Sequence, residues 1–398
     1  MHSRNCVLKD KENIFWPPWP QYGDEEKDAV GKVIGSNQLF AADRVKEFEE
    51  NFQRYTGTDF AKGVGNATQG LHLALASLDI GVGDEVIVTP YTFIASASSI
   101  LMQNAVPVFC DCDPKTRALS AENIAAHISV RTRAIIVVHM FGYPADMDPI
   151  LKLAQKHGLF VIEDASHAYG AEYKGRRCGS LGDLGVFSMH QRKALSAGDG
   201  GVITTNDPEI NEKIYRLRSF GHKQLSYNYR MTEFAGALGL IQLNKLDTHN
   251  KIRQKNVDLL ERLLEDVEGL DVIKPLSCAT SVYYRVLLHF DPEQFNCNLD
   301  IFSSHVQGSG VPLEMTWELI HKHPHFNPEK VPARGLPWES STYNGVMKGK
   351  RYDSLSFPVI ENLCDNHLLE LSVHPPVSDE EIAFAVKTIA IVAEKFAR

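Results

Sequence analysis

Two residues in the sequence have types and positions that could do chemistry together. Asp164 lies at the end of an apolar run, residues 159–162, that predicts a buried strand, and Lys193 follows 29 residues later. A glycine-rich turn at residues 198–201 comes next. Either charged residue alone is uninformative, because most charged side chains are simply solvated. Together, a lysine amine and a carboxylate can hold a carbonyl compound as a Schiff base and polarise it.

This pair fits the chemistry of pyridoxal phosphate, which needs four functions from a protein. A lysine holds the aldehyde, and a carboxylate keeps the pyridine nitrogen protonated so that the ring withdraws electrons. An anion site must hold the phosphate, and a flat side chain must cover the ring face. Lys193 and Asp164 would serve the first two functions. A carboxylate facing a protonated pyridine should stay ionised.

Residues for the other two functions are present. Asn66, Ala67, Thr68 and Gln69 precede the first clear helical pattern, so their backbone N–H groups and the Thr68 hydroxyl would suit a phosphate. Asn66 with Gln69 three residues later fits a capping box equally well, and both interpretations stay open. Phe93 could stack on a ring, although its pattern also fits a core position.

These residues need a framework that brings strand ends together. From about residue 60 to 205, apolar segments alternate with helical patterns. The predicted strands cover residues 85–88, 133–138, 159–162, 186–188 and 202–204, and the predicted helices cover 68–78 and 148–156. Apolar strands separated by helices predict a mostly parallel sheet covered by helices. Such sheets bind ligands beyond the carboxyl ends of their strands, which is where Asp164 is expected.

The pattern changes after residue 230, which predicts a second unit. Two long helices are expected at 232–246 and 251–266, followed by a smaller α+β region that ends in an amphipathic helix at 379–396. We therefore predict an N-terminal arm at residues 1–25, a large domain at 26–250 and a small C-terminal domain at 251–398.

Composition excludes several classes of protein. Hydrophobic residues make up 43% of the 398 residues and charged residues 23%, which is ordinary globular usage rather than that of a disordered or fibrous chain. The formal net charge of −9 argues against a broad nucleic-acid surface. No apolar run approaches a membrane span, and the first residues lack the apolar core of a signal peptide. Seven scattered cysteines indicate a reducing cytoplasm.

Other motifs give weaker signals. The pair Cys110 and Cys112 has no second pair to complete a zinc set, and we interpret it as a strand end that enters a turn. His321, His323 and His325 lie in a polar, proline-containing stretch, and we interpret them as loop or surface histidines. No metal site is predicted. No G-x-G-x-x-G follows a strand, which argues against a dinucleotide-binding protein.

Several strings also resemble one family, the DegT/DnrJ/EryC1/StrS aminotransferases. The string EDASHAYGA at 163–171 is similar to the family's E-D-A-A-[QH]-A-x-G-A, and FSM at 187–189 with Lys193 and GDGG is similar to its F-S-F-x3-K-x4-G-E-G-G. NYRMTE at 228–233 also matches, as do the strings GDEVIV and YTF. The resemblance covers roughly residues 18–265.

The resemblance implies a fold and residue roles. The fold is α/β of the aspartate-aminotransferase type (pyridoxal phosphate fold type I), with a mostly parallel central sheet and a smaller C-terminal α+β domain. Lys193 would form the Schiff base and shuttle the proton, Asp164 would pair with the pyridinium nitrogen, and His167 would contact the phenolic oxygen. The other implied contacts are Thr68, Gln69 and Ser188 on the phosphate, Phe93 stacked on the ring, and Asn228 on the phosphate of the neighbouring subunit.

The sequence departs from the family pattern in a few places. Ala67 replaces a common glycine, Met189 replaces the second phenylalanine and Asp199 replaces glutamate, but none of these changes removes a required group. Some relatives carry histidine instead of the lysine and are dehydratases, so Lys193 favours transamination. His190 is three residues too early for that role and is interpreted as a substrate-lining or structural residue.

The resemblance also implies substrates. The reaction would be a ping-pong transfer of an amino group from glutamine or glutamate to a ketone on a polyhydroxylated ring, either a keto-inositol or a keto-sugar. The strings at 16–22 and 187–189 are most similar to the glutamine:scyllo-inosose aminotransferase and 3-amino-5-hydroxybenzoate synthase branches. Arg230 fits either an anionic substrate group or a structural ion pair. Trp317 and Trp338 fit either the substrate mouth or the core.

Two alternatives remain open. One is a dehydratase or aromatising synthase on the same cofactor, and the other is a non-catalytic regulatory relative. Only a transaminase would yield pyridoxamine phosphate from an amino-acid donor. A homodimer with shared active sites is expected because Asn228 would serve the neighbouring site, and no nucleic-acid or membrane partner is expected.

Overall fold

The structure is a computed structural model that describes residues 16–40, 42–220, 222–326, 337, 341 and 343–398. Its centre is a seven-stranded sheet in the order β1-β9-β8-β5-β4-β2-β3. The strands are β1 Phe60–Val64, β2 Glu85–Val88, β3 Val106–Phe109, β4 Thr132–Val138, β5 Phe160–Asp164, β8 Leu184–Ser188 and β9 Gly201–Thr205. Residues 1–15 of the expected arm and Trp338 lie outside the described residues.

The central sheet is mostly parallel, as the apolar strand patterns predict. The neighbours β3, β2, β4, β5 and β8 run parallel, and β9 runs antiparallel to both β8 and β1. Every residue of β2, β3, β8 and β9 is buried, because helices cover both faces of the sheet. The carboxyl ends of β1, β5 and β8 therefore meet at one edge.

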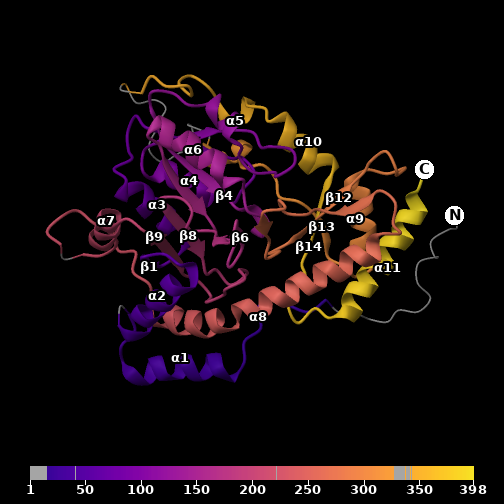
Figure 1. The fold of residues 1–398 in the computed structure, drawn as a ribbon, viewed down its shortest axis with the longest axis horizontal. Coiled ribbons are helices and arrows are strands. Elements are labelled where there is room, and N and C mark those ends of the chain that lie inside the picture. The colour runs from indigo at the N-terminus through magenta and orange to yellow at the C-terminus, as the bar shows by residue number, and fades with distance from the viewer. Residues whose placement is uncertain (1–15, 41, 221, 327–336, 338–340, 342) are drawn as a thin grey trace.

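Helices surround this sheet (Figure 1). They are α2 Asp43–Thr56, α3 Ala67–Ser77, α4 Ala95–Met102, α5 Ala121–Ala125, α6 Met147–His157 and α7 Pro208–Arg218. Helix α1 Asp24–Ser36 lies away from the sheet and packs against the long helix α8, Glu233–Leu264. The helices predicted at 68–78 and 148–156 are thus confirmed as α3 and α6. Helix α3 begins at the N-cap Asn66, whose side chain accepts a hydrogen bond from the Gln69 backbone N–H. Residues 70–77 of α3 are all buried, which anchors the start of this helix against the sheet.

The prediction of two helices at 232–246 and 251–266 is wrong, because one 32-residue helix, α8 Glu233–Leu264, spans both. The polar residues 247–250 suggest a break, but they include no glycine or proline. Instead, the Asn250 side chain is buried and donates to the Tyr169 carbonyl at 2.8 Å. Residue 250, the expected domain boundary, therefore lies within a helix, and the division into domains stays a proposal.

The C-terminal part of the chain is an α+β unit reached by α8 (Figure 1). Its antiparallel sheet has the order β10-β12-β14-β13, formed by Leu270–Val272, Val286–Phe290, Leu368–Leu371 and Leu313–Met315. Its helices are α9 Leu299–Gln307, α10 Pro358–Asn366 and α11 Asp379–Phe396, and a small sheet joins β6 Glu172–Tyr173, β7 Arg176–Arg177 and β11 Ala279–Thr280. Helix α11 confirms the amphipathic helix predicted at 379–396.

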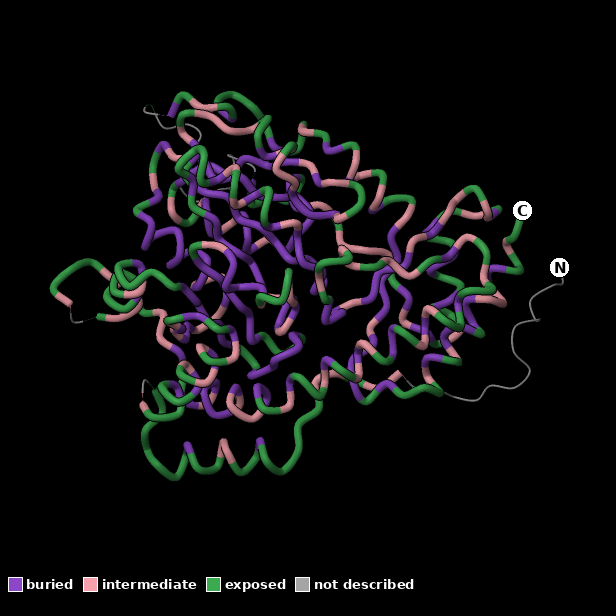
Figure 2. Tube along the Cα trace, in the orientation of Figure 1, coloured by how far each residue is buried: buried purple, intermediate pink, exposed green. Residues whose placement is uncertain are grey.

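Burial follows this architecture (Figure 2). Buried residues concentrate on the central sheet and on the facing sides of its helices, whereas α1 is largely exposed. Cys110 and Cys112 are buried just after β3. Among the described residues, no helix combines the length and the apolarity that crossing a membrane requires.

Candidate active site

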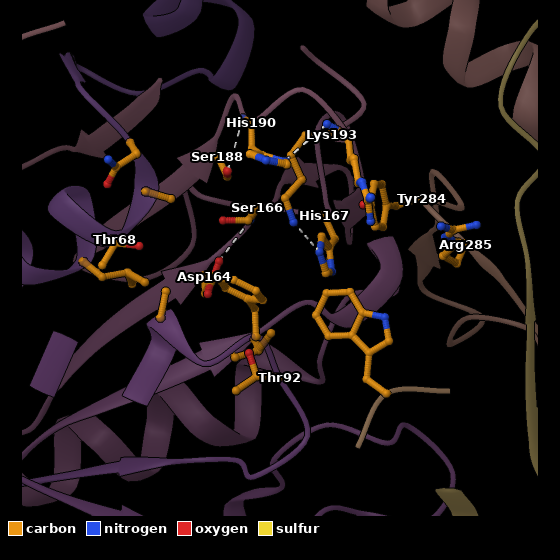
Figure 3. A pocket seen from close by; sticks show the side chains of 18 of the residues that line it. Thr68, Thr92, Asp164, Ser166, His167, Ser188, His190, Lys193, Tyr284 and Arg285 are labelled. Atoms are coloured by element: carbon orange, nitrogen blue, oxygen red, sulfur yellow. Dashed lines mark hydrogen bonds between the residues drawn. The ribbon is translucent and has the colours of Figure 1, made fainter. Parts of the chain in front are cut away.

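A cavity of about 770 Å³ lies beyond the carboxyl ends of β5 and β8 (Figure 3). Asp164 is the last residue of β5, Ser188 is the last residue of β8, and the start of α3 follows β1. The predicted site residues that line this cavity are Asn66, Ala67, Thr68, Phe93, Asp164, His167, Ser188, His190 and Lys193. Parallel strand packing therefore brings together groups that are up to 127 positions apart in the sequence (66 to 193).

Three predicted site residues lie outside this lining. The backbone N–H of Gln69 donates a hydrogen bond to the side chain of the N-cap residue Asn66. The side-chain Oε1 of Gln69 is buried beside Gly65. Asn228 accepts hydrogen bonds from the Arg230 guanidinium at 2.8 and 3.2 Å. Within one described chain, Asn228 and Arg230 are thus surface neighbours, not cavity groups.

Phe93 lies in the loop between β2 and α4, five residues beyond the end of β2. Its side chain is 54% exposed, which excludes the core interpretation. It meets the Trp317 ring edge to face, with the centroids 6.1 Å apart. Phe93 and Trp317 therefore flank the cavity as two aromatic surfaces.

Lys193 and His167 contact each other in the cavity. The Lys193 Nζ lies 2.6 Å from His167 Nε2, and the two side chains point toward each other (Figure 3). The Phe141 backbone N–H donates to the other ring nitrogen, Nδ1, at 3.3 Å. An imidazole that accepts at Nδ1 carries its proton on Nε2, so that Nε2–H faces the lysine. Only a neutral lysine amine has the lone pair that accepts this proton.

Burial shifts the Lys193 amine toward the same uncharged form. Burial lowers its pKa most, the charge of Asp164 opposes this shift and the charge of Arg285 adds to it, and the resulting pKa is about 8. Burial, together with the charges of Lys193 and Arg285, holds the pKa of His167 well below its usual value. At pH 7 the protonated amine still predominates, but the uncharged form, which attacks an aldehyde, is far more available than in a free lysine.

The position of Asp164 is fixed by donors on both carboxylate oxygens. Ser96 Oγ donates to Oδ2 at 2.7 Å, and the Ser166 backbone N–H donates to Oδ1 at 3.2 Å. Thr92 Oγ1 lies 2.8 Å from Ser96 Oγ and continues this network. Successive side chains of a strand point to opposite faces, so Asp164 faces the cavity while Glu163 faces away from it.

Glu163 belongs to a separate buried cluster with His139 and Cys178. Its carboxylate accepts backbone N–H groups from Gly179, Leu181 and Gly182 and lies 2.9 Å from His139 Nε2. Because both of its oxygens are already engaged, we interpret this cluster as the anchor of the 178–182 loop on β5.

Aromatic rings enclose His167. Tyr284 stacks on one side with the centroids 4.3 Å apart, and Phe141 lies parallel to the ring at 5.7 Å. Phe141 has φ 53°, a left-handed backbone conformation that is uncommon for a bulky residue. In this conformation the Phe141 N–H donates its hydrogen bond to His167, so the strained backbone of Phe141 helps to orient the His167 ring.

The N-terminal arm reaches the same segment. The Trp19 indole N–H donates to the Lys193 carbonyl at 2.9 Å, and the Tyr22 hydroxyl lies 2.6 Å from Ser196 Oγ. The Trp19 ring stacks on His374 with the centroids 5.0 Å apart. The arm therefore fastens the backbone of the lysine segment to the C-terminal unit.

Sequence analysis missed most of the cavity wall that the C-terminal unit supplies. This wall contains Tyr284, Arg285, Glu314 and Glu370 beside Trp317. One signal was available: Glu370 is a carboxylate within the otherwise apolar strand Leu368–Leu371. A charge in a buried strand indicates a function or a partner, because burial without either is costly.

The residues present fit pyridoxal phosphate. The start of α3 offers backbone N–H groups to a phosphate, and the Thr68 and Ser188 side chains line the same part of the cavity. This cradle packs tightly on the neighbouring strand, because a Cβ at Gly201 would lie 2.7 Å from the Asn66 carbonyl carbon. The Asp164 carboxylate and the Lys193 amine, whose pKa is lowered to about 8, complete the donor set that this cofactor requires.

The protonation state of Lys193 predicts a pH dependence of cofactor capture. A protonated amine cannot attack an aldehyde, so the rate constant for uptake of pyridoxal phosphate by the apoprotein should rise with pH and level off above about 8. Stopped-flow absorbance measures this profile. Arg285→Gln removes a charge that lowers the pKa of Lys193, so the midpoint should move to higher pH. A flat profile, or one that falls with pH, would contradict a titrating lysine.

Comparison with known proteins adds independent findings. The family model of the DegT/DnrJ/EryC1/StrS aminotransferase family matches residues 20–366. The spore coat polysaccharide biosynthesis protein SpsC of Bacillus subtilis is 37% identical over 402 aligned positions, which cover 96% of this chain and 98% of that protein. The L-glutamine:2-deoxy-scyllo-inosose aminotransferase of Streptomyces fradiae is 35% identical over 277 positions, covering 63% of this chain and 65% of that protein. The X-ray structure of the aminotransferase from Psychrobacter cryohalolentis matches with a TM-score of 0.84 at 31% identity, covering 95% of this chain and 99% of that one.

Proposed function

The chain belongs to the DegT/DnrJ/EryC1/StrS aminotransferase family, and we propose that it moves an amino group from glutamine or glutamate to a ketone on a polyhydroxylated ring. Pyridoxal phosphate would be the cofactor and the reaction would be ping-pong. Similarity to proteins named for spore coat polysaccharide and for 2-deoxy-scyllo-inosose supports a keto-sugar or keto-inositol. The observation that carries the proposal is the buried Lys193 amine, 2.6 Å from His167, in one cavity with Asp164.

When bound, pyridoxal phosphate supplies an aldehyde that links to amines and a ring that withdraws electrons from the substrate carbon. Lys193 Nζ would attach to that aldehyde and, once released by the donor amine, would move the proton at the substrate α-carbon. Asp164 would hold the proton on the pyridine nitrogen. His167 Nε2–H would donate to the phenolic oxygen in place of the lysine.

The remaining residues would bind and orient. Thr68, Ser188 and the start of α3 would hold the phosphate, with Asn66 capping that helix. Phe93 would cover the ring face, and Trp317 would help to exclude water from the reacting atoms. The two alternatives on the same fold are a dehydratase and a regulatory relative. Neither would convert pyridoxal phosphate to pyridoxamine phosphate with an amino-acid donor in the first half reaction.

Absorbance spectroscopy of the protein loaded with pyridoxal phosphate tests the proposal directly. Addition of glutamine or glutamate should convert the aldehyde form of the cofactor to its amine form in a single turnover. Chromatography of the released cofactor would identify it as pyridoxamine phosphate. An aldehyde form that neither donor changes would contradict the proposed reaction, and failure to bind the cofactor covalently would contradict the role of Lys193.

We also propose a homodimer with shared active sites. Phe40, Phe220 and Leu225 are 58%, 60% and 94% exposed, and the Arg230 guanidinium lies over the first two rings at 4.7 and 6.0 Å. Asn228 lies beside this apolar surface, where it could reach the phosphate of a second subunit. Phe40 and Phe220 thus lie together around Arg230, and Leu225 extends from the same chain segment as Phe220. Large apolar side chains left in water are typical of an interface.

Light scattering after size exclusion should therefore give twice the mass of one chain. Leu225→Asp should raise the dimer dissociation constant by about tenfold or more, because it places a charge in the interface. Val130→Asp is the matched control, since Val130 is 93% exposed in a different loop and should leave the dimer intact. A stable and active monomer of the unmodified chain would contradict the shared site.

A further inference from the structure

Two carboxylates and one guanidinium face the cavity from the C-terminal unit. Glu314 on β13 and Glu370 on β14 are direct register partners, so their side chains project from the same face of the sheet. Arg285 lies immediately before β12, the strand on the other side of β14. All three residues line the cavity that contains Lys193.

Glu370 is the informative member of this group. Only 2% of the residue is exposed, and its Oε2 is buried with no hydrogen-bond partner among the described residues. Burial raises the pKa of Glu370 to about 7, Arg285 and a hydrogen bond from Trp317 oppose this shift, and Glu314 adds to it. A buried carboxylate oxygen without a partner is costly, and the cost is removed when a ligand donates a hydrogen bond to it.

The charges of this wall discriminate between ligands. Arg285 can bind one carboxylate through its planar fork. Glu314 and the ionised form of Glu370, which predominates above about pH 7, are hydrogen-bond acceptors, so an N–H or O–H group satisfies them and a second carboxylate is repelled. Arg192, another cation of the lining, is exposed, so solvent weakens its attraction for an anion.

The two proposed amino donors, glutamine and glutamate, differ in whether the end of the side chain can donate a hydrogen bond. Glutamine ends in a neutral carboxamide with two N–H donors, whereas glutamate ends in a carboxylate that only accepts. Both carry the α-carboxylate that Arg285 can bind. In the second half reaction, the same acceptors would meet the hydroxyl groups of a polyol ring, which also donate hydrogen bonds.

We propose that Glu370, with Glu314, is the specificity subsite of this aminotransferase and selects glutamine over glutamate by accepting hydrogen bonds from the carboxamide. This inference rests on the proposed function, because it assigns one of its two donors. It makes Glu370 a binding residue for the donor side chain, not a proton-transfer group.

Single-turnover kinetics test the subsite. The probes are glutamine and glutamate, added separately to the dimeric protein loaded with pyridoxal phosphate, and the readout is the rate constant for conversion of the cofactor divided by the apparent dissociation constant of the donor. The variants are Glu370→Gln and Glu314→Gln. The control is Glu318→Gln, which changes an exposed carboxylate outside the cavity lining.

We expect the unmodified protein to prefer glutamine by about tenfold or more, and Glu370→Gln to reduce that preference by about tenfold. Glu314→Gln should act in the same direction with a smaller effect, and Glu318→Gln should retain the full preference. Glu314 is exposed, so its replacement keeps the test valid even if the buried variant fails to fold.

The outcomes separate this inference from the proposed function. If both donors convert the cofactor but the glutamine preference is absent, or is unchanged in both cavity variants, the subsite is wrong and the aminotransferase proposal stands. If neither donor converts the cofactor, the proposed donors and this subsite are both overturned.

Discussion

Replacing Lys193 with alanine should reduce multiple-turnover amino transfer by about 10³-fold or more. The substitution removes the amine that attaches the cofactor and also the base that moves the proton at the substrate carbon. The effect is large because the described structure places no second lysine in the cavity lining. The measurements are steady-state transfer from the donor and the absorbance of the bound cofactor.

Lys152→Ala provides the matched control, because Lys152 is an exposed lysine on α6. It should bind the cofactor and turn over like the unmodified protein. Lys193→Ala should bind pyridoxal phosphate only non-covalently, so reduction with borohydride should leave the protein unlabelled. Retained multiple-turnover transfer in Lys193→Ala would show that another group performs both tasks.

Replacing Asp164 with asparagine should lower the rate constant of the first half reaction by about 10²-fold or more. Asparagine keeps the shape and can still accept from Ser96, but it lacks the charge that keeps a pyridine nitrogen protonated. Asp164 raises the pKa of Lys193, so its loss should move that pKa below about 8. The variant should therefore capture the cofactor at lower pH than the unmodified protein while turning over more slowly.

This opposite change in capture and turnover distinguishes a catalytic role from general damage to the fold. A misfolded site would lose both activities together. Asp59→Asn, which alters an exposed aspartate before β1, should change neither quantity. An Asp164→Asn protein with unchanged half-reaction rates would exclude the proposed contact with the pyridine nitrogen.

Much of the framework follows from local patterns. The strands β2, β4, β5, β8 and β9 each contain a short run of buried apolar residues, and the helices α3, α6 and α11 have apolar faces at helical spacing. The functional role of Asp164 could be predicted from its position at a strand end, because such sheets bind ligands beyond the carboxyl ends of their strands. The sequence did not predict that α8 is one continuous helix. The polar segment at 247–250 stays helical through tertiary contacts, such as that of Asn250 with Tyr169.

The sequence alone predicted the family, an expected class of cofactor and nine residues that line one cavity, because short strings carry the groups that this chemistry requires. Tertiary structure decided what surrounds them. Trp19 meets the Lys193 carbonyl across 174 positions. Strand register places Glu370 opposite Glu314, and Arg285 directly precedes β12, the other neighbour of β14. The lowered pKa of Lys193 likewise depends on its burial and on the charge of Arg285. These properties arise from distances and desolvation between remote segments, which no local spacing of residue types contains.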